Sequence, residues 1–437
     1  MVAVTSGQPL QWIWGAWAAV GYALAAIAAT FWPARGRVAA LGLALAGAVA
    51  APLAWQVSVG GRQAAADEGS LQVVARSAVL LLRHGTPYVP AHQISHVLGY
   101  NPYEPAMAIF GLPAAAGLHG AAGSPRLWMG ITAAVVLFAG FRLAAPCSPV
   151  RNTAFAFASP VLALPLTTGL TDVPVLALLG LTLAGVAACP RRPRALLVAV
   201  VALGVACAMK ATAWPALPVI AAMLAARDGI RIATRFIAAV GLTATALAVA
   251  MAPASVTAPA ALFQNTVLFP LGMTRYQTPA QSPLPGHLLA LTGPAGRWAA
   301  IGLLGAAILA LAMSLIVWPP ADTQQAAWRL AAGLALLFAL APASRWGYFL
   351  YPAAIVGFMA MTRNERGLWQ RIWFRQQAAG QCGVVRALRA CSYRREMRSA
   401  TISAADCDCR TRATPCPAHI ERASMSPVVP TIGGAGS

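Results

Sequence analysis

Long apolar runs separated by short polar connections dominate the first 362 residues of the chain. A membrane-spanning helix needs about 20 mostly apolar residues, within a range of about 17 to 25. Seven runs meet or approach that length: 11–32, 38–59, 127–145, 172–188, 235–252, 298–318 and 346–362. Four more lie at or below the lower limit: 153–168, 195–209, 211–226 and 326–341. The pattern predicts an all-α polytopic membrane protein with about eleven transmembrane helices.

Composition excludes a soluble single domain. Of the 437 residues, 59% are hydrophobic and 10% are charged, whereas about 25% are charged in an average globular protein. The charge is lopsided, with 31 basic residues against 11 acidic ones and a net charge of +20. Every basic residue except Lys210 is an arginine. These arginines lie between apolar runs instead of forming the basic face of a folded domain, so we expect no nucleic acid partner.

The arginines also predict a topology, because cytoplasmic loops are enriched in basic residues. Arginine-bearing connections occur at 35–37, 142–151, 191–194, 227–235, 329 and 363–375. All six connections fall on one side of the membrane under two conditions. Residues 60–126 must make no net crossing of the bilayer, and the pair 195–209 and 211–226 must form a hairpin of two spans. The N-terminus is then external and the C-terminus cytoplasmic. We expect no cleavable signal peptide, since residues 1–10 lack a basic segment.

This topology gathers polar side chains on the external face. They lie in two external loops, 60–126 and 253–297, and in short turns beside them: Asp67, Glu68, Glu104, Asp172, Lys210, Arg275 and Arg345. Within the first loop, the apolar stretch 105–118 is broken by prolines and glycines, and would be interfacial or re-entrant with its backbone buried in protein. The external face is therefore where we expect the chemistry.

The first external loop also predicts an interfacial helix over 71–84, capped by Ser70 and ended by Gly85, Thr86 and Pro87. Its apolar face would carry Leu71, Val74, Ala78, Leu81 and Leu82, while Gln72, Arg76 and Arg83 point elsewhere.

Several short motifs follow one another in the predicted external segments. An acidic residue after an early span and an interfacial helix closing with Gly85-Thr86-Pro87-Tyr88 come before Tyr100-Asn101-Pro102-Tyr103, which opens an apolar segment. Later motifs are Thr171-Asp172-Val173-Pro174, Lys210-Ala211-Thr212-Ala213-Trp214-Pro215 and Ser344-Arg345-Trp346-Gly347-Tyr348. In this order, over about residues 38 to 362, the chain resembles the family-87 glycosyltransferases. These are bacterial GT-C membrane enzymes that use polyprenyl-phosphate sugars, often mannose.

The resemblance implies a GT-C-like bundle in the bacterial cell membrane with an external cavity, where a lipid-phosphate sugar enters from the bilayer. It implies a hexosyltransferase that moves the sugar to a lipid or glycan acceptor with inversion. It also implies that a carboxylate in the first large external loop is the general base, either Asp67 or Glu68 here. We expect no cofactor and no metal.

The leaving polyprenyl phosphate needs cations to meet its developing charge, and preorganised donors are commonly the largest contribution in such sites. Lys210 and Arg345 are the preferred phosphate ligands, and the lone lysine suits phosphate as a compact point charge. The full set of candidates for substrate and phosphate binding is Lys210, Arg345, Arg275, Asp172, Tyr103 and Tyr276.

Plainer interpretations stay open for each candidate. Asp67 and Glu68 could be solvated charges near a helix start, Asp172 a helix cap, and Lys210 and Arg345 anchors that snorkel toward water. Tyr276 and Arg275 lie in the Pro-rich segment 263–290, which is either a lid over the donor site or a connection. A metal site formed by His84, His92, His96 and His119 matches no strong spacing pattern.

Other function classes stay open as well. A transporter or flippase fits the number of spans, although inverted repeats and ionisable groups near the midplane, which are typical of transporters, are not evident. A non-catalytic membrane assembly partner is the third possibility.

Composition changes near residue 376, and residues 363–437 are interpreted as a cytoplasmic tail rich in arginine and cysteine and without stable structure. The tail carries five of the eight cysteines, which a reducing cytoplasm would keep as thiols. Zinc binding by Cys407, Cys409, Cys416 and His419 is a weak match to known spacings. We assign no catalytic residue there.

Overall fold

The computed structural model describes residues 9–31, 36–56, 58, 69–144 and 148–362. The described residues are helical, and they contain no strand beyond a single bridge between Gln281 and Ser344. The predicted tail 363–437 and the predicted base, Asp67 or Glu68, lie outside the described residues.

The described residues of the eleven predicted apolar runs lie largely on helices. These helices are α2 (Pro9–Phe31), α3 (Gly36–Leu45) continued by η1 (Ala46–Ala50) and α4 (Ala51–Trp55), α9 (Pro125–Ala144), α10 (Pro149–Ala158) with α11 (Pro160–Thr167), α12 (Val173–Ala188), α13 (Ala195–Met209), α14 (Ala216–Asp228), α15 (Ile230–Met251), α19 (Pro294–Val317), α20 (Thr323–Leu340) and η8 (Trp346–Phe349) with α21 (Leu350–Thr362).

Shorter elements form the connections. They are α6 (Gly69–His84), η3 (Ala91–Gln93), η4 (Val97–Gly99), η5 (Pro105–Gly111), α7 (Leu112–Ala115), α8 (Gly120–Gly123), η6 (Ala211–Ala213), α16 (Ala254–Thr257), α17 (Pro259–Phe263), η7 (Gln264–Leu268) and α18 (Pro285–Ala290).

Five helical segments are long and apolar enough to cross a membrane, judged by length and composition: Pro9–Phe31, Gly36–Trp55, Pro125–Ala144, Ile230–Met251 and Pro294–Val317. The chain is therefore consistent with a helical membrane protein, as its composition predicts. The contrast between α19 and α12 agrees with this: α19 buries only Gly296, Ala300 and Ala307, whereas α12 is buried on almost every face. A helix that is apolar all round and left exposed is suited to lipid.

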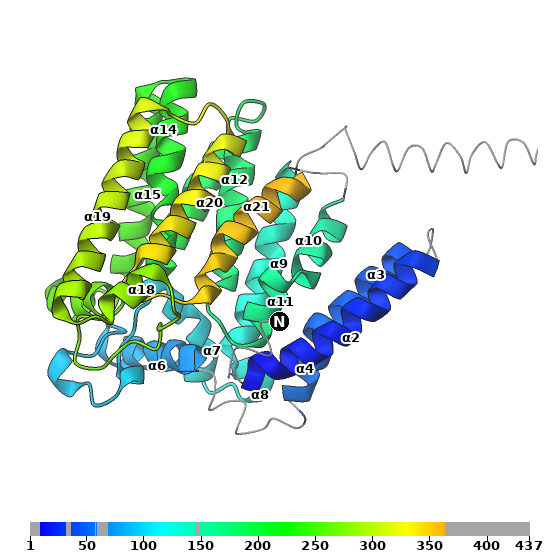
Figure 1. The fold of residues 1–437 in the computed structure, drawn as a ribbon, viewed down its shortest axis with the longest axis horizontal. Helices are drawn as coiled ribbons and strands as arrows, with labels where there is room; N and C mark the ends of the chain where they lie inside the picture. The colour runs from blue at the N-terminus through cyan, green and yellow to red at the C-terminus, as the bar shows by residue number, and fades with distance from the viewer. Residues whose placement is uncertain (1–8, 32–35, 57, 59–68, 145–147, 363–437) are drawn as a thin grey trace, which may run out of the picture. The chain divides into compact units, whose positions relative to one another are not determined.

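The core lies around α12, which packs against α9, α13 and α21 (Figure 1). Predicted run 153–168 forms two helices because Pro160 follows Ser159, whose ψ of 146° is extended. A residue that precedes proline is disfavoured in the helical region, so the helix restarts at the proline.

At the N-terminus, α2 and the α3–η1 segment pack through glycines. A Cβ on Gly21 would lie 2.6 Å from the Cα of Gly47, so the two backbones are in direct contact. The indole of Trp14 donates to the Ala48 carbonyl at 2.9 Å. Small residues commonly permit such close helix contacts in membrane proteins.

Contacts between helix ends show that many termini meet at one end of the described helices, which we call the Lys210 end. Gln56, just after α4, donates to the carbonyl of Thr167 at the end of α11 (2.8 Å) and accepts from Arg126 at the start of α9. Lys210, after α13, pairs with Asp172, before α12.

Opposite termini meet at the other end, which we call the arginine end. Arg227, at the end of α14, lies beside Cys189, at the end of α12. Arg329 in α20 donates to Ser314 Oγ in α19 (3.0 Å) and to the Trp318 carbonyl (3.2 Å). These contacts place the end of α12 beside the end of α14, and the end of α19 beside the start of α20.

Helix α6 begins two residues before the predicted helix and lies at the lower end of the long helices in Figure 1. Two details of the prediction were wrong. Ser70 lies inside the helix and is not its cap, and Leu82 is exposed while Val73 is buried in its place. Gly85 ends the helix with φ of +67°, a conformation that glycine adopts without strain.

Candidate functional site

The Lys210 end holds a buried polar cluster formed by Asp172, Lys210 and Tyr351. The ammonium of Lys210 forms an ion pair with Asp172 Oδ1, and the Tyr351 hydroxyl donates to the same oxygen at 2.7 Å. The side chains come from three different helix ends, before α12, after α13 and within the first turn of α21. One carboxylate oxygen therefore ties together segments that are far apart in sequence.

Three tyrosine rings surround the ammonium. Lys210 Nζ lies 5.5 Å from the ring centroid of Tyr103, 5.8 Å from Tyr348 and 5.9 Å from Tyr351. Cation–π attraction at such distances is strongest where the cation is removed from water. Lys210 is only 8% exposed, so the rings and Asp172 together compensate a charge that has little contact with solvent.

Local backbone geometry positions each member of the cluster. Lys210 has an extended backbone (φ −157°, ψ 135°) where α13 ends, so the helix does not continue through it. Asp172 precedes α12 but its side chain caps no backbone amide. The cap interpretation of Asp172 was therefore wrong, as was the snorkelling interpretation of Lys210, because the two side chains are engaged with each other.

Tyr103 is held by the Tyr-x-Pro-Tyr segment. The Asn101 side-chain oxygen accepts from the Tyr103 amide at 3.1 Å, and the Tyr103 carbonyl accepts from the Tyr88 hydroxyl at 2.9 Å. The next amide, that of Glu104, donates to the Met209 carbonyl at 3.1 Å. This places the segment directly beside Lys210.

Arg345 lies close by, just before η8. It is partly buried, and within the described part of the chain its Nε finds no hydrogen-bond acceptor. Its neighbour Ser344 is fully buried, and its hydroxyl likewise has no partner among described residues. Unsatisfied buried donors of this kind call for an explanation, and an anionic ligand would supply one.

Arg275 and Tyr276 lie apart from this cluster. Arg275 is exposed and its guanidinium carbon lies 5.4 Å from the Tyr276 ring centroid. Tyr276 packs instead against a small apolar cluster around Ile94, Tyr100 and Phe269. The structure brings Asp172, Lys210 and Tyr103 together, but it records no contact between this pair and Lys210.

The segment 263–290 is anchored on both sides. Asn265 accepts from the Asn101 amide at 2.8 Å, and the rings of Tyr100 and Phe269 stack with centroids 4.5 Å apart. The Ser282 amide donates to the Ser344 carbonyl at 3.0 Å. This segment therefore bridges the Tyr-x-Pro-Tyr segment and the turn that carries Arg345.

Glu104 is a residue that the sequence placed on the external face but did not single out. Its carboxylate makes no hydrogen bond or ion pair with the described residues, and burial raises its pKa from 4.5 to about 7. Tyr348 and Tyr351 were also missed as members of the site. Their signal was present in the sequence, since both lie within six residues of Arg345 in the last predicted span.

Within the described residues, no group of three or more His, Cys, Asp and Glu side chains is placed to hold a metal. The four histidines of the first external loop therefore do not form a cluster.

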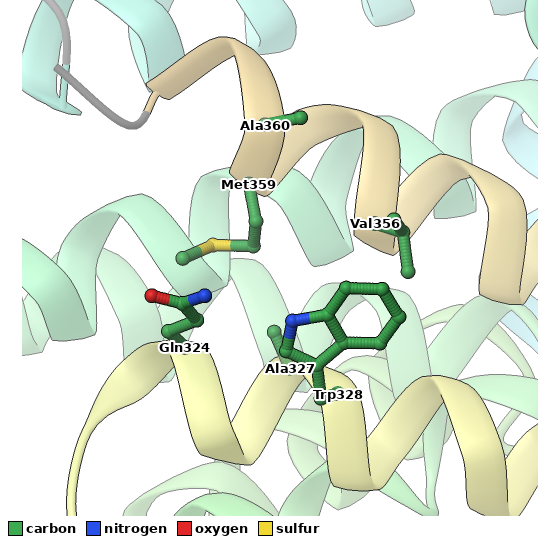
Figure 2. A pocket seen from close by; sticks show the side chains of 6 residues that line it. All are labelled: Gln324, Ala327, Trp328, Val356, Met359 and Ala360. Carbon is green, nitrogen blue, oxygen red and sulfur yellow. The ribbon is translucent and has the colours of Figure 1, made fainter. Parts of the chain in front are cut away.

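Two small pockets lie elsewhere. One, of about 60 Å³, is lined by Gln324, Ala327, Trp328, Val356, Met359 and Ala360. Figure 2 shows it between α20 and α21, with the Met359 side chain extending toward Gln324 and the Trp328 ring lying below Val356. The other, also about 60 Å³, is lined by residues of the segment 271–297, among them His287 and Arg297, and by Pro342 and Ala343. Neither includes a member of the Lys210 cluster, and neither has the volume for a lipid-linked sugar.

The Lys210 cluster is therefore the candidate site: one carboxylate, one ammonium and three tyrosines, with a partly buried arginine in the same segment as Tyr348. Its composition suits binding of an anion together with proton transfer. No protein-family model, no curated protein and no solved structure matches this chain.

Proposed function

We propose that the protein is a membrane glycosyltransferase of the family-87, GT-C type. It transfers a hexose, with mannose the first choice, from a polyprenyl-phosphate sugar to a lipid or glycan acceptor on the external face of the bacterial plasma membrane. The observation that carries the proposal is the buried Asp172–Lys210–Tyr351 cluster. It lies at the helix ends that the arginine placement assigns to the outside.

The fold part of the proposal is a bundle of about eleven transmembrane helices. Five helical segments have the length and composition of spans. The remaining apolar runs form shorter helices, among them α12, α13 and α21, which pack between the longer ones. Short helices whose ends are surrounded by protein leave room for polar side chains at membrane depth.

The proposed reaction is a displacement at the anomeric carbon. The acceptor oxygen attacks that carbon, its bond to the phosphate oxygen breaks, and the electron pair leaves with the polyprenyl phosphate. Asp67 or Glu68 takes the acceptor proton, which can contribute about 10² to 10⁴-fold in rate. Both residues directly precede α6 in the sequence, and α6 packs on η5, which follows Glu104.

Lys210 and Arg345 are proposed to bind the leaving phosphate. An ammonium has three hydrogen-bond donors, and Asp172 is the acceptor that engages Lys210 in the described structure. The remaining donors and the unpaired Nε of Arg345 are then available to phosphate oxygens. In this role Asp172 holds Lys210 in position, while Tyr103 and its partner rings limit access by water.

The direct test incubates membranes containing the protein with radiolabelled polyprenyl-phosphate mannose, glucose or arabinose. We expect a new labelled product with at least one donor. The paired substitution Asp67→Asn with Glu68→Gln should abolish transfer while the protein still inserts. Asp228→Asn is the matched control, because Asp228 is an exposed acid at the arginine end. Full activity of the double variant overturns the base assignment.

Absence of transfer with all three donors counts against a transferase. The same membranes, reconstituted in vesicles, then report whether a lipid-linked sugar crosses the bilayer, which is the outcome expected of a flippase.

A further inference from the structure

The small pocket lined by the segment 271–297 and by residues 342–343 contains polar groups that the described residues leave without partners. Its lining comes from residues before, within and after α18 and includes His287 and Arg297. In Figure 1, α18 lies at the lower end of the long helices, as α6 does. The pocket therefore belongs to the end of the bundle that the arginine placement assigns to the external face.

His287 offers this pocket a hydrogen-bond acceptor. The side chain is buried, with 9% exposed, and its Nδ1 lies 3.0 Å from the carbonyl oxygen of Pro342. Because a carbonyl oxygen can only accept, Nδ1 carries the ring proton and donates it. In the neutral ring, Nε2 then keeps its lone pair, and it has no partner among the described residues.

Arg297 offers hydrogen-bond donors to the same pocket. Its Nη1 donates to the Gly272 carbonyl at 3.0 Å. No acceptor within the described part of the chain engages its Nε or Nη2. Since a guanidinium holds its donors in one plane, the bond to Gly272 restrains the group and leaves these other donors available to a ligand.

The two groups together select the chemistry of a ligand. An anion would accept from Arg297 but has no proton to donate to His287 Nε2, and an ammonium group would have the opposite defect. A hydroxyl both donates and accepts, so two neighbouring hydroxyls satisfy both side chains. The rest of the lining is mostly apolar, as at Leu271, Ala280 and Leu291, which suits the C–H face of a sugar ring.

The size of the pocket limits how much of a ligand enters. Its volume is about 60 Å³, whereas one water molecule needs about 10 to 15 Å³ of such space. Several hydroxyl-sized groups therefore fit, which corresponds to one edge of a hexose. The exposed side chains of Gln277 and Gln281 also line the pocket, so it opens to solvent and the rest of the ligand stays outside.

We propose that this pocket is a hexose subsite, in which Arg297 donates to one ring hydroxyl and His287 Nε2 accepts from a neighbouring one. The inference rests on the proposed function and deepens it. Pro342 and Ala343 line the pocket and directly precede Ser344 and Arg345. A sugar bound here lies next to the turn that carries the proposed phosphate ligand. It is either the hexose of the donor or a hexose of a glycan acceptor, and both present the same hydroxyl chemistry.

The test measures sugar binding directly, by saturation-transfer NMR on the full-length protein in lipid nanodiscs. The probes are methyl α-mannoside and methyl α-glucoside, and we expect at least one to bind to wild type. His287→Asn keeps a side-chain donor for the Pro342 carbonyl but lacks Nε2, so Kd should rise about 3 to 10-fold. Arg297→Met should raise Kd about 10 to 100-fold, because its hydrogen bonds are charge-assisted. His119→Asn is the matched control, since His119 is exposed and does not line the pocket.

A third variant leaves both polar groups in place. Ala343 is half-buried and lines the pocket, so Ala343→Leu should narrow the pocket and abolish binding at an unchanged unfolding temperature. Absence of binding to wild type, or binding that all three variants leave unchanged, overturns the subsite and indicates a pocket that holds only water. Stronger competition by sulfate than by chloride at equal ionic strength also overturns it, because it indicates an anion site.

Addition of polyprenyl-phosphate mannose to the same sample distinguishes the two sources of the sugar. Loss of the glycoside signal assigns the pocket to the donor hexose, and its retention assigns the pocket to the acceptor; both outcomes support the subsite. The binding assay also separates the two proposals. Glycoside binding without transfer by wild type rejects the proposed function alone, whereas transfer without glycoside binding rejects the subsite alone.

Discussion

The two ends of the helical bundle each hold an acid–base ion pair, and the two pairs differ in almost every physical respect. At the Lys210 end, the side chains of Lys210 and Asp172 are 10% and 5% exposed and come from residues 38 positions apart. At the arginine end, Arg227 and Asp228 are neighbours in sequence and 22% and 33% exposed. Only the first pair joins separate helices.

This comparison shows that the number of charges at each end does not indicate their effect on stability unless the burial of each side chain is known. An exposed pair gains modest Coulomb energy in water and loses side-chain entropy. A buried pair has already lost its hydration, so removal of one partner leaves an uncompensated charge. We therefore expect the stability of the protein to depend more on the buried pair at the Lys210 end than on the exposed pair at the arginine end.

The largest expected effect follows from breaking the buried pair. Asp172→Ala leaves the Lys210 ammonium buried without a carboxylate and also removes the acceptor of the Tyr351 hydroxyl. We expect a loss of about 3 to 5 kcal/mol in the free energy of unfolding. Thermal unfolding of the detergent-purified protein, followed by intrinsic fluorescence, measures it.

A paired replacement gives the control for this prediction. Asp172→Leu together with Lys210→Met removes both charges and keeps the volume apolar, so it should recover most of the lost stability. It should not restore transfer if Lys210 binds phosphate. A double variant as unstable as Asp172→Ala alone would show that the pair is not what holds these helix ends.

The second prediction concerns pH and Glu104. Its pKa is raised from 4.5 to about 7 by burial, so the folded protein holds a proton that the unfolded chain releases above pH 4.5. The free energy of unfolding should therefore fall as pH rises from about 4.5 to 7, by up to about 3 kcal/mol. Below that window the contribution is fully present. Glu104→Gln should flatten this part of the curve and be the more stable protein at pH 8.

The positions of the main helices could be predicted from the sequence, because apolar runs long enough to span a membrane have few structures other than a helix open to them. Within the described residues, each of the eleven runs lies largely on helices. The break between α10 and α11 follows from Pro160. It was not predicted because the hydrophobic pattern alone treats 153–168 as one continuous apolar run.

The site was only partly readable, because burial and pairing depend on packing between distant helices. Sequence reasoning found Asp172, Lys210 and Tyr103, yet nothing in one chain shows that Lys210 pairs with a residue 38 positions away. The interpretations that failed, a cap for Asp172 and an anchor for Lys210, treat each residue with its local segment alone. Tyr351 was missed for the same reason, since its hydrogen bond to Asp172 depends on which helix ends meet.

The third prediction tests the tight crossing that supports the Lys210 end. A Cβ on Gly111 in η5 would lie 2.5 Å from the Val74 carbonyl oxygen and 2.9 Å from the Ala75 Cα in α6. Gly111→Ala should therefore destabilise the protein by about 1 to 3 kcal/mol. Gly241→Ala is the matched control in α15, where an added Cβ meets nothing within 4 Å. The control should be neutral or stabilising by about 0.5 to 1 kcal/mol, and equal losses in the two variants would refute the steric explanation.

The smallest expected effect is at the arginine end and completes the comparison. Arg227 donates to both carboxylate oxygens of Asp228. Its Nη2 lies 2.7 Å from Oδ2, and its Nε lies 3.0 Å from Oδ2 and 3.1 Å from Oδ1. This good geometry should nevertheless contribute only about 0 to 1 kcal/mol, because both side chains reach water. Asp228→Ala should change the unfolding temperature little, and the remaining difference should shrink as salt is raised. A loss comparable to that of Asp172→Ala would mean that pairing geometry, and not burial, sets the energetic weight of these charges.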